Sequence, residues 1–460
     1  MESSKRLKEV REQIAEKTRV IIEAFCQRTL LAKEIAPLKK QLNLPIDDYL
    51  VEKNLAEQVR SICVRHGLDP SKGLKLLNFL ISESISLQKS SQSPLITPTT
   101  VFEETRRLEE QGSKVIHLEV GEPDFGPPQR VVDAAVRALK EGRTHYTSQY
   151  GIPELRRALA DKMSERWNAS IRSNEILVTP GGRAALVLAL SATLTQGDSA
   201  IIIEPAWPAY RKCIESLGCR PRVLHTRFED EWEPDVSKIE DLIDETTKVI
   251  IINSPCNPTG KIFAKKTMNS IIDVATKHNL TILSDEAYAE FSYTDRYSLL
   301  PEDCTKIVIG TFSKAWGMTG FRLGYLITSS EKCDVMAELA GDLYTSVPEP
   351  IQIAGLAALD CFDEVDVYVA QMKERCRLIT SLLKSLPVEF KEPDGAFYVF
   401  FKLSRGESAQ EFVEQLLRKH LVALTPGSGF GDYPQFIRLS FCRPEEELRE
   451  GVARMRELLL

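Results

Sequence analysis

A lysine, a serine and an arginine within the segment 311–325 could together hold a reactive cofactor. Lys314 directly follows Ser313, and Arg322 comes eight residues later among several glycines. A lysine amine can form a Schiff base with an aldehyde, while a hydroxyl and a guanidinium group suit phosphate oxygens. The segment therefore predicts a site for a cofactor that carries both an aldehyde and a phosphate, with Lys314 as the point of attachment.

Two upstream segments add groups that can act on an aromatic heterocycle. The apolar run 280–284 ends in Asp285, and Tyr288 comes three residues further on. A carboxylate at the carboxyl end of a strand faces the crevice in which α/β sheets bind ligands. We expect Asp285 to keep a ring nitrogen protonated and Tyr288 to donate to a phenolic oxygen. Asn257, which follows the apolar run 249–252, can donate to the same oxygen.

Five further motifs share the same part of the chain. They are an entry strand and loop, a tyrosine-rich loop, a glycine turn, a Trp-Pro segment and an arginine in an apolar strand, at 118–125, 145–156, 179–185, 204–210 and 436–441. Together with the lysine segment, this ordered set resembles the fold-type I pyridoxal-phosphate aminotransferases of the aspartate/aromatic aminotransferase superfamily. The resemblance covers about residues 94–460, and it implies a mostly parallel α/β large domain with a small α+β domain.

The resemblance also implies a cofactor and a role for each residue. Pyridoxal 5'-phosphate is the implied cofactor, and Lys314, Asp285 and Tyr288 are the implied catalytic residues. The freed amine of Lys314 moves a proton from the α-carbon of an amino acid, and the ring held by Asp285 accepts the developing charge. A keto acid then reverses the sequence with ping-pong kinetics. The other implied contacts are Tyr146 from a neighbouring subunit with Gly182, Arg183, Ser313 and Arg322 at the phosphate, Trp207 and Asn257 at the ring, and Gly121, Asn257 and Arg438 at the substrate carboxylate.

The front of the chain has a different pattern. Its first ninety residues contain no predicted strand, and apolar residues recur at helical spacing over 7–35, which predicts a long amphipathic helix. Asn43-Leu-Pro45 should end that helix, and two shorter helices are predicted around 47–66 and 70–88. Because so few helices bury a core poorly, we expect this module to dimerise.

Polar side chains recur on these helices at spacings that place them on shared faces. They are Arg11, Arg28 and Lys39 on the first helix, Asp48 and Glu52 on the second, and Ser84 and Gln88 on the third. The set resembles the all-α chorismate mutases of the AroQ type, in which two three-helix chains intertwine. The resemblance implies that the arginines bind the carboxylates of chorismate, one arginine coming from the other chain, and that the acids contact its hydroxyl. Lys39 and Gln88 would stabilise the charge that grows on the ether oxygen, and the rearrangement needs no nucleophile.

Two residues of the front module depart from that family. Val51 stands where the family usually carries another arginine, and Pro37 should kink the first helix just before Lys39. The alternative for this module is a dimerisation or regulatory domain that binds chorismate or an aromatic amino acid without turning it over.

The elements that must position these residues form two modules, 1–90 and 91–460, joined by the polar stretch 89–100. Alternating apolar strands and helical segments in the larger module predict a mostly parallel sheet covered on both faces. The predicted strands are 176–179, 199–204, 248–253, 280–284, 306–310 and 323–327, with 397–401 and 437–441 in the small domain.

Composition narrows the class of protein further. The 10 cysteines form no C-x-x-C pair, which favours reduced thiols in the cytoplasm, and no apolar run has membrane-spanning length. A net charge of −7 argues against general nucleic-acid binding, and the 6 histidines show no metal-ligand spacing. We therefore expect a cytoplasmic homodimer or larger homo-oligomer, without a metal, that acts on amino acids, keto acids and chorismate.

The sequence leaves the reaction and the substrate open. The same residue set would serve a lyase, a decarboxylase or a cyclopropane-forming synthase, whereas a transcription regulator is disfavoured because the front module has no hairpin signal. Arg438 suits any α-carboxylate, and Arg183 and Arg143 fit backbone-only or surface roles better than binding of a side-chain acid. We expect aspartate or glutamate as donor and prephenate or an arylpyruvate as acceptor. The alternative is a general aspartate aminotransferase with a non-catalytic front domain.

Overall fold

The computed structural model describes residues 2–42, 44, 48–90, 98–295, 297–404, 406 and 408–459. The chain divides into two compact units, of which the first holds helices α1 to α3 with the short segments Gln196–Asp198 and Gly218–Arg220, and the second holds α4 to α14 and the strands apart from the first residue of β4. The boundary predicted between residues 90 and 91 falls at the edge of a stretch, 91–97, that lies outside the described residues.

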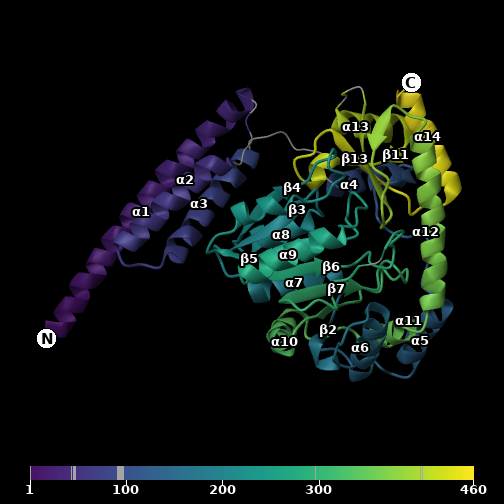
Figure 1. Ribbon diagram of the computed structural model, residues 1–460, viewed down its shortest axis with the longest axis horizontal. Helices are drawn as coiled ribbons and strands as arrows, with labels where there is room; N and C mark the ends of the chain where they lie inside the picture. The colour runs from purple at the N-terminus through teal and green to yellow at the C-terminus, as the bar shows by residue number, and fades with distance from the viewer. Residues whose placement is uncertain are drawn as a thin grey trace. The chain divides into compact units, whose positions relative to one another are not determined.

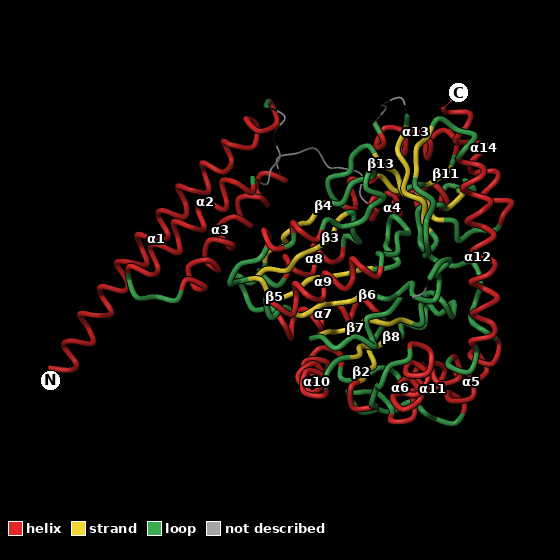
Figure 2. Tube along the Cα trace, in the orientation of Figure 1, coloured by secondary structure: helices red, strands yellow, loops and turns green. Residues whose placement is uncertain are grey.

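Three helices form the first unit, namely α1 (Glu2–Gln41), α2 (Tyr49–Arg65) and α3 (Pro70–Ser90) (Figures 1 and 2). α3 packs against both α1 and α2, and its residues Leu74, Leu77 and Ile81 form a small buried cluster. The three predicted helices are confirmed. α1 ends at Gln41, while Asn43 and Pro45 of the predicted break lie outside the described residues.

Pro37 does not end the first helix. α1 continues through it to Gln41, and helical hydrogen bonding extends past the proline, because the Leu42 amide donates to the Leu38 carbonyl at 3.0 Å. Proline removes one backbone donor but leaves the bonds of later residues intact. Lys39 therefore stays within α1.

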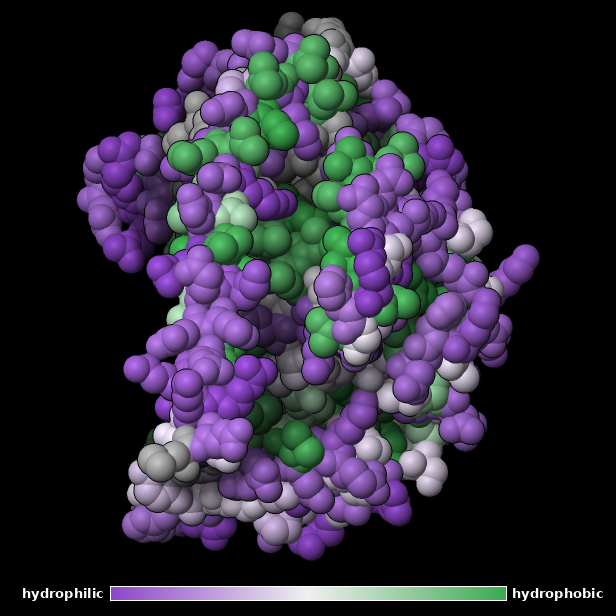
Figure 3. Space-filling model, turned by 90° about the vertical axis from the view of Figure 1, so that its left-hand side faces the viewer, coloured by the Kyte–Doolittle hydropathy of each residue, from purple (hydrophilic) through white to green (hydrophobic). Residues whose placement is uncertain are grey.

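Apolar side chains are left uncovered on the first unit. Figure 3 shows one face of the molecule, on which apolar patches lie between hydrophilic side chains. A long helix with an exposed apolar face favours association with a further chain. The large apolar side chains of α1 that are more than half exposed are Leu7, Ile14, Val20, Ile21, Ile22, Leu30, Leu31 and Leu38.

A seven-stranded sheet forms the centre of the second unit, with strand order β2-β8-β7-β6-β5-β3-β4. β3, β5, β6 and β7 run parallel to one another, whereas β8 is antiparallel to both of its neighbours. Each predicted strand is present to within a residue at either end, and only β4, whose first residues are polar and half-buried, was not predicted. The strands are β2 (Ile176–Thr179), β3 (Ser199–Glu204), β4 (Arg220–His225), β5 (Thr247–Asn253), β6 (Thr281–Asp285), β7 (Lys306–Thr311) and β8 (Gly324–Ile327).

Helices pack around this sheet because their apolar faces and the buried strands share one large hydrophobic core (Figure 1). α7 contacts the strands at the start of the sheet order, and α8 and α9 contact strands further along it. The helices of this part are α5 (Gln129–Lys140), α6 (Pro153–Trp167), α7 (Gly182–Thr193), α8 (Ala209–Ser216), α9 (Lys265–Lys277), α10 (Ser330–Tyr344) and α11 (Glu349–Ala358).

A smaller layer completes the second unit. Its four-stranded sheet has the order β12-β13-β10-β9, and a two-stranded parallel pair joins β1 to β11. The two strands predicted here are confirmed as β10 and β13. The elements are α4 (Pro98–Glu110), β1 (Ile116–His117), α12 (Phe362–Leu383), β9 (Val388–Phe390), β10 (Tyr398–Leu403), α13 (Ala409–His420), β11 (Val422–Ala423), β12 (Thr425–Pro426), β13 (Phe436–Ser440) and α14 (Glu445–Leu459).

Two further observations concern the described residues as a whole. None of their helices combines the length and the apolar character needed to cross a membrane. All ten cysteines are free thiols, and most of them are buried.

Candidate active site

A cavity of about 520 Å³ opens at the carboxyl ends of the parallel strands. β5 ends at Asn253, β6 at Asp285 and β7 at Thr311, and all three residues line the cavity, as expected for a ligand site in an open α/β sheet. The structure brings nearly all of the predicted cofactor and substrate residues together around it, namely Gly121, Gly182, Arg183, Trp207, Asn257, Asp285, Tyr288, Ser313, Lys314, Arg322 and Arg438. The exception is Tyr146, whose side chain is 88% exposed to solvent.

Lys314 lies in the turn that follows β7 and points into the cavity. Its Nζ donates to the carbonyl oxygen of Gly121 at 2.7 Å. Burial lowers the pKa of the amine, and the positive charges of Arg438 and Arg322 lower it further. A lowered pKa keeps more of the amine unprotonated, which is the form that attacks an aldehyde or accepts a proton.

Asp285 ends β6 and is held by two donors. Its Oδ2 accepts from the Tyr210 hydroxyl at 2.7 Å, and its Oδ1 accepts from the Ala287 amide at 3.1 Å. Burial raises the pKa of this carboxyl, so a cation placed against it would offset the cost of its charge. A protonated ring nitrogen is a cation of this kind.

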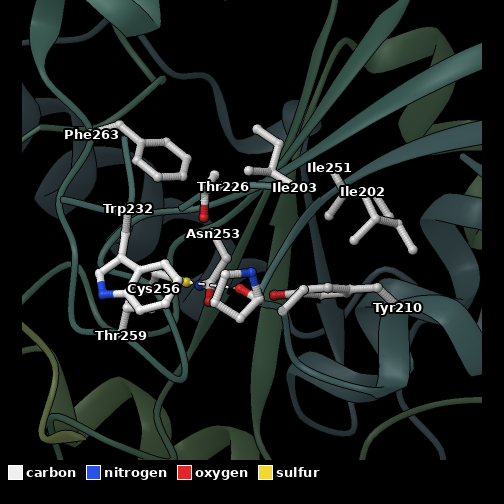
Figure 4. A pocket seen from close by; sticks show the side chains of 12 residues that line it. Ile202, Ile203, Tyr210, Thr226, Trp232, Ile251, Asn253, Cys256, Thr259 and Phe263 are labelled. Carbon is white, nitrogen blue, oxygen red and sulfur yellow. Dashed lines mark hydrogen bonds between the residues drawn. The ribbon is translucent and has the colours of Figure 1, made fainter. Parts of the chain in front are cut away.

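The floor beneath Asp285 is almost filled by side chains. Tyr210 and Asn253, which both bond to Asp285, line a small space of about 10 Å³ together with Cys256, and Figure 4 shows these three side chains close to one another. Asn253 donates from Nδ2 to the Asp285 carbonyl at 2.9 Å and accepts from the Asn257 amide at 2.8 Å. Burial raises the pKa of Cys256 to about 11, which keeps the thiol neutral. The floor therefore fixes both Asp285 and the Asn257 turn.

Backbone and side-chain donors converge where α7 begins. Gly181 has φ 84°, and a Cβ there would lie 2.6 Å from Nη2 of Arg322, so only glycine lets the guanidinium approach the start of the helix. Ser313 is buried and accepts from the Thr311 hydroxyl at 3.0 Å, which leaves its own hydroxyl proton free to donate. A helix N-terminus, a hydroxyl and a guanidinium together suit a phosphate group.

Arg438 is a buried guanidinium on β13. Its Nη1 donates to Oδ1 of Asn257 at 2.8 Å, and its Nη2 donates to the Glu119 carbonyl. Its Nε has no hydrogen-bond partner among the described residues. A buried cation with unused donor capacity and no carboxylate partner in the described chain is suited to the carboxylate of a substrate.

Arg143 and Arg183 have different environments. Arg143 forms an ion pair with Glu349 at 2.7 Å and is half exposed, so its predicted surface role is confirmed. Arg183 is not confined to a backbone role, because its guanidinium lies 5.0 Å from the ring of Trp207 and lines the cavity, while its binding of a second carboxylate stays a prediction. Its direction depends on the first turn of α7, which a sequence motif does not specify.

Four residues of the site were missed by the sequence interpretation. Tyr210 forms a hydrogen bond with Asp285, and Tyr398 forms one with Tyr288. Asn253 accepts from the Asn257 amide, and the Glu119 carbonyl accepts from Arg438. Tyr210 and Glu119 lie inside two of the motifs identified in the sequence, at 204–210 and 118–125, so both could have been predicted. Tyr398 lies in an apolar strand and gave no signal apart from its hydroxyl.

In the first unit, the structure joins two of the predicted residues. Nη1 of Arg28 on α1 donates to both the Ser84 hydroxyl and the Leu80 carbonyl on α3, each at 2.6 Å. Burial lowers the pKa of Arg28, and Gln88, one turn beyond Ser84, is buried with an Oε1 that has no partner among the described residues. These groups lie on one side of α3 and are desolvated, as ligands of a dianion would be.

The other predicted residues of this unit are arranged differently. Asp48 caps α2, because its carboxylate accepts from the Val51 amide at 3.2 Å, and Glu52 lies in the first turn of the same helix. Lys39 is half-buried near the end of α1, whereas Arg11 is exposed. At about 1.5 Å of rise per residue, Arg11 lies roughly 25 Å from Arg28 along α1. A single chain therefore cannot bring both arginines to one small substrate.

Comparison with known proteins agrees with this geometry. Residues 113–455 match the family Aminotransferase class I and II, and residues 10–89 match Chorismate mutase type II. The aspartate aminotransferase of Thermotoga maritima is 37% identical over 378 residues, covering 81% of this chain and 98% of the relative. The probable aspartate/prephenate aminotransferase of Aquifex aeolicus is 34% identical over 382 residues, covering 79% and 96%.

Solved structures show the same relationship. The aspartate aminotransferase of Thermus thermophilus with maleate matches with a TM-score of 0.76 and 31% identity, covering 81% of this chain and 98% of that one. The chain belongs to the class I and II aminotransferases, and it carries a chorismate mutase type II domain in front. Both resemblances inferred from the sequence are confirmed, and the chain is an enzyme.

Proposed function

We propose that the second unit binds pyridoxal 5'-phosphate and transfers an amino group from an amino acid to a keto acid. The observation that supports this is one cavity that combines a half-buried lysine, a carboxylate at a strand end and a phosphate cradle. When bound, the cofactor supplies an electron-withdrawing ring. Lys314 attaches it and afterwards moves a proton at the substrate α-carbon, while Asp285 keeps the ring nitrogen protonated.

The remaining residues of the cavity bind and orient. Ser313, Arg322 and the first amides of α7 would hold the phosphate, and Trp207 would cover one face of the ring. Tyr288 and Asn257 would donate hydrogen bonds to its phenolic oxygen. Arg438 would receive the α-carboxylate and so present the α-carbon to the Lys314 amine.

The test is the Lys314→Ala variant. It should lose both transamination and the visible absorption band of the bound cofactor, because the attachment point and the proton carrier are the same amine. Mutase activity should persist, since its residues lie on α1 to α3. Lys266→Ala, which changes an exposed lysine of α9, is the matched control and should retain both activities. Transamination by a folded Lys314→Ala protein at the wild-type rate would contradict the proposal.

We further propose that the acceptor is prephenate or an arylpyruvate and that aspartate or glutamate is the donor. The mutase domain supports this, because its product prephenate carries the α-keto carboxylate that Arg438 suits. A relative is named a probable aspartate/prephenate aminotransferase. Arg183 supplies the additional cation that the ring carboxylate of prephenate would need, whereas an arylpyruvate needs only an apolar wall.

A panel of keto acids tests the acceptor. Catalytic efficiency would be compared for prephenate, phenylpyruvate, 4-hydroxyphenylpyruvate, oxaloacetate and 2-oxoglutarate under identical conditions. Turnover of the last two alone would make the second unit a general aspartate aminotransferase and would refute the aromatic acceptor.

For the first unit we propose rearrangement of chorismate to prephenate in a site shared by two chains. The Arg28 guanidinium, which is held by Ser84 and desolvated by burial, supports a site for an anion, and the buried amide of Gln88 lies one turn beyond Ser84 on α3. Arg11 would enter from a second chain, since it lies roughly 25 Å from Arg28 on the same helix. This arrangement also explains why α1 exposes a long apolar face.

Subunit complementation tests the shared site. Arg11→Ala and Arg28→Ala homodimers should each lack mutase activity, because every site then misses one arginine. Refolding or coexpressing the two together gives heterodimers in which one site has both arginines, so roughly a quarter of wild-type activity should return. Verified heterodimers without activity would contradict the shared site, and active wild-type monomers would contradict the requirement for a second chain.

A further inference from the structure

We propose that Tyr398 is a positioning residue that connects Arg438, the proposed carboxylate-binding group, with the hydroxyl of Tyr288. This inference rests on the proposed aminotransferase function and extends it. Tyr398 would hold the guanidinium through its ring, and through its own hydroxyl it would direct the hydrogen bond that Tyr288 donates to the cofactor's phenolic oxygen.

The first connection is between the ring of Tyr398 and the guanidinium of Arg438. Tyr398 begins β10 and Arg438 lies on the paired strand β13, where Arg438 is opposite Phe400. Alternate residues of a strand share a face, so Tyr398 is the diagonal neighbour of Arg438. The Arg438 Cζ lies 4.6 Å from the Tyr398 ring centroid and 4.7 Å from that of Phe430. Two aromatic rings thus fix the plane of the guanidinium.

The second connection is between two buried hydroxyls. The Tyr398 and Tyr288 oxygens are 2.8 Å apart, and the rings meet edge to face at 5.6 Å between centroids. Tyr398 is 1% exposed and Tyr288 is 6% exposed. Burial raises the pKa of both hydroxyls well above that of an ordinary tyrosine, so each keeps its proton and one must donate to the other.

The lack of a side chain at Gly121 makes space for the Tyr398 hydroxyl. A Cβ at that position would lie 1.8 Å from the Tyr398 hydroxyl oxygen, so any larger residue would displace it. The carbonyl of the same glycine accepts from Lys314. The Tyr398 hydroxyl therefore lies between Gly121 and the Tyr288 hydroxyl, and both tyrosines line the cavity.

The direction of the hydroxyl pair follows from what a third partner requires. Either hydroxyl can donate within the pair. An anionic phenolic oxygen can only accept, so Tyr288 must turn its proton to that oxygen. Tyr398 then becomes the donor to Tyr288, and a donor that itself accepts a hydrogen bond is strengthened by it. The carboxylate-binding arginine and the phenolic oxygen are thereby joined through two buried side chains, Tyr398 and Tyr288.

Tyr398→Phe tests the hydroxyl, because it keeps the ring and deletes only the oxygen. The readout is the pH midpoint of the visible absorption band of the bound cofactor without substrate. A donor to the phenolic oxygen favours the deprotonated form of the attached lysine nitrogen, so a weaker donor raises the midpoint. We expect a rise on the order of 0.5 pH unit in Tyr398→Phe and a larger one in Tyr288→Phe.

The double variant makes the test specific. In the Tyr288→Phe background, Tyr398→Phe should add no further shift, because its effect passes through the Tyr288 hydroxyl. Tyr398→Leu also removes the ring, and we expect it to weaken binding of maleate, a dicarboxylate without a keto group, by roughly three- to thirty-fold. Tyr398→Phe should bind maleate as the wild type does.

Several outcomes would overturn the inference. One is a folded Tyr398→Phe protein with a lowered melting temperature and an unchanged midpoint, since that shows a merely structural role. Additive shifts in the double variant, or unchanged maleate binding in Tyr398→Leu, would also refute it. Wild-type protein that develops no visible band with pyridoxal phosphate would overturn the proposed function and this inference together. A normal band whose pH midpoint is the same in Tyr398→Phe as in the wild type would overturn only the inference.

Discussion

Replacement of Arg183 by glutamine should change which keto acids the enzyme accepts. Arg183 is the second residue of α7, and its side chain lines the cavity with the guanidinium stacked 5.0 Å from the Trp207 ring. It forms no ion pair with any other described residue, so its charge is available to a ligand. A hydrogen bond to a charged group contributes about 1.5–3 kcal/mol, which corresponds to roughly ten- to 150-fold in kcat/KM.

The expected loss depends on the substrate. Arg183→Gln should lower kcat/KM by that factor for prephenate and oxaloacetate, which carry a second carboxylate, and leave phenylpyruvate nearly unchanged. Arg183→Lys keeps the charge but loses the planar fork, so it should retain part of the preference. Arg143→Gln changes an arginine that is already paired with Glu349 and serves as the control. The assay is steady-state transamination of each acceptor with one donor.

Two results would refute this reasoning. An equal loss for phenylpyruvate would show that Arg183 acts on the cofactor or on Trp207 rather than on a distal carboxylate. Unchanged kinetics with every acceptor would show that the second carboxylate, where one is accepted, is bound elsewhere. Cofactor affinity measured in parallel separates the first case, because the amides of α7 are the same in the variant and the wild type.

Two further predictions concern the supports of the site. Gly181→Ala should weaken binding of pyridoxal phosphate about tenfold in a fluorescence titration, because the alanine Cβ would displace the guanidinium of Arg322 and a side chain at φ 84° and ψ 168° costs about 1–3 kcal/mol; unchanged affinity would contradict the cradle. The pKa of His117 is raised to about 9, chiefly by its hydrogen bond to Glu119. Because this folded pKa lies above the unfolded value of about 6.5, the stability it contributes is complete below that value and is lost as pH rises through 9. The melting temperature should therefore fall over this range more in the wild type than in His117→Gln, and parallel curves would refute the ion pair.

Much of the cavity could be predicted from the sequence because its reactive side chains lie at or just after the ends of strands. Lys314, Asp285 and Asn257 each follow an apolar strand, and parallel strands bring their carboxyl ends to one edge of a sheet. Strand type and order therefore determined that these side chains would meet. Tyr398 could not be predicted in this way, because a tyrosine inside a buried strand is typical of a core residue. The role of its hydroxyl becomes apparent only from the hydrogen bond with Tyr288.

Side-chain direction was the harder problem. Arg183 is a motif residue whose amide was predicted to face phosphate, and the direction of its guanidinium depends on packing against Trp207, which lies on another segment. In the front module, periodicity located the three helices but not the capping role of Asp48. That carboxylate is a good helix N-cap by residue type alone, so its local bond competes with any contact to a substrate hydroxyl.

Both units carry a residue whose proposed role requires another chain. Tyr146 is an aromatic side chain 88% exposed, which burial alone disfavours, and Arg11 lies too far along α1 to meet Arg28. If each unit pairs with the same partner, one two-fold axis closes a dimer with both kinds of site complete. If the units pair with different partners, closure requires a larger ring or a dihedral assembly. In either case neither proposed activity belongs to a single chain. If both units pair with the same partner, dilution that separates the subunits should abolish the transaminase and mutase activities together. If they pair with different partners, one activity should be lost before the other.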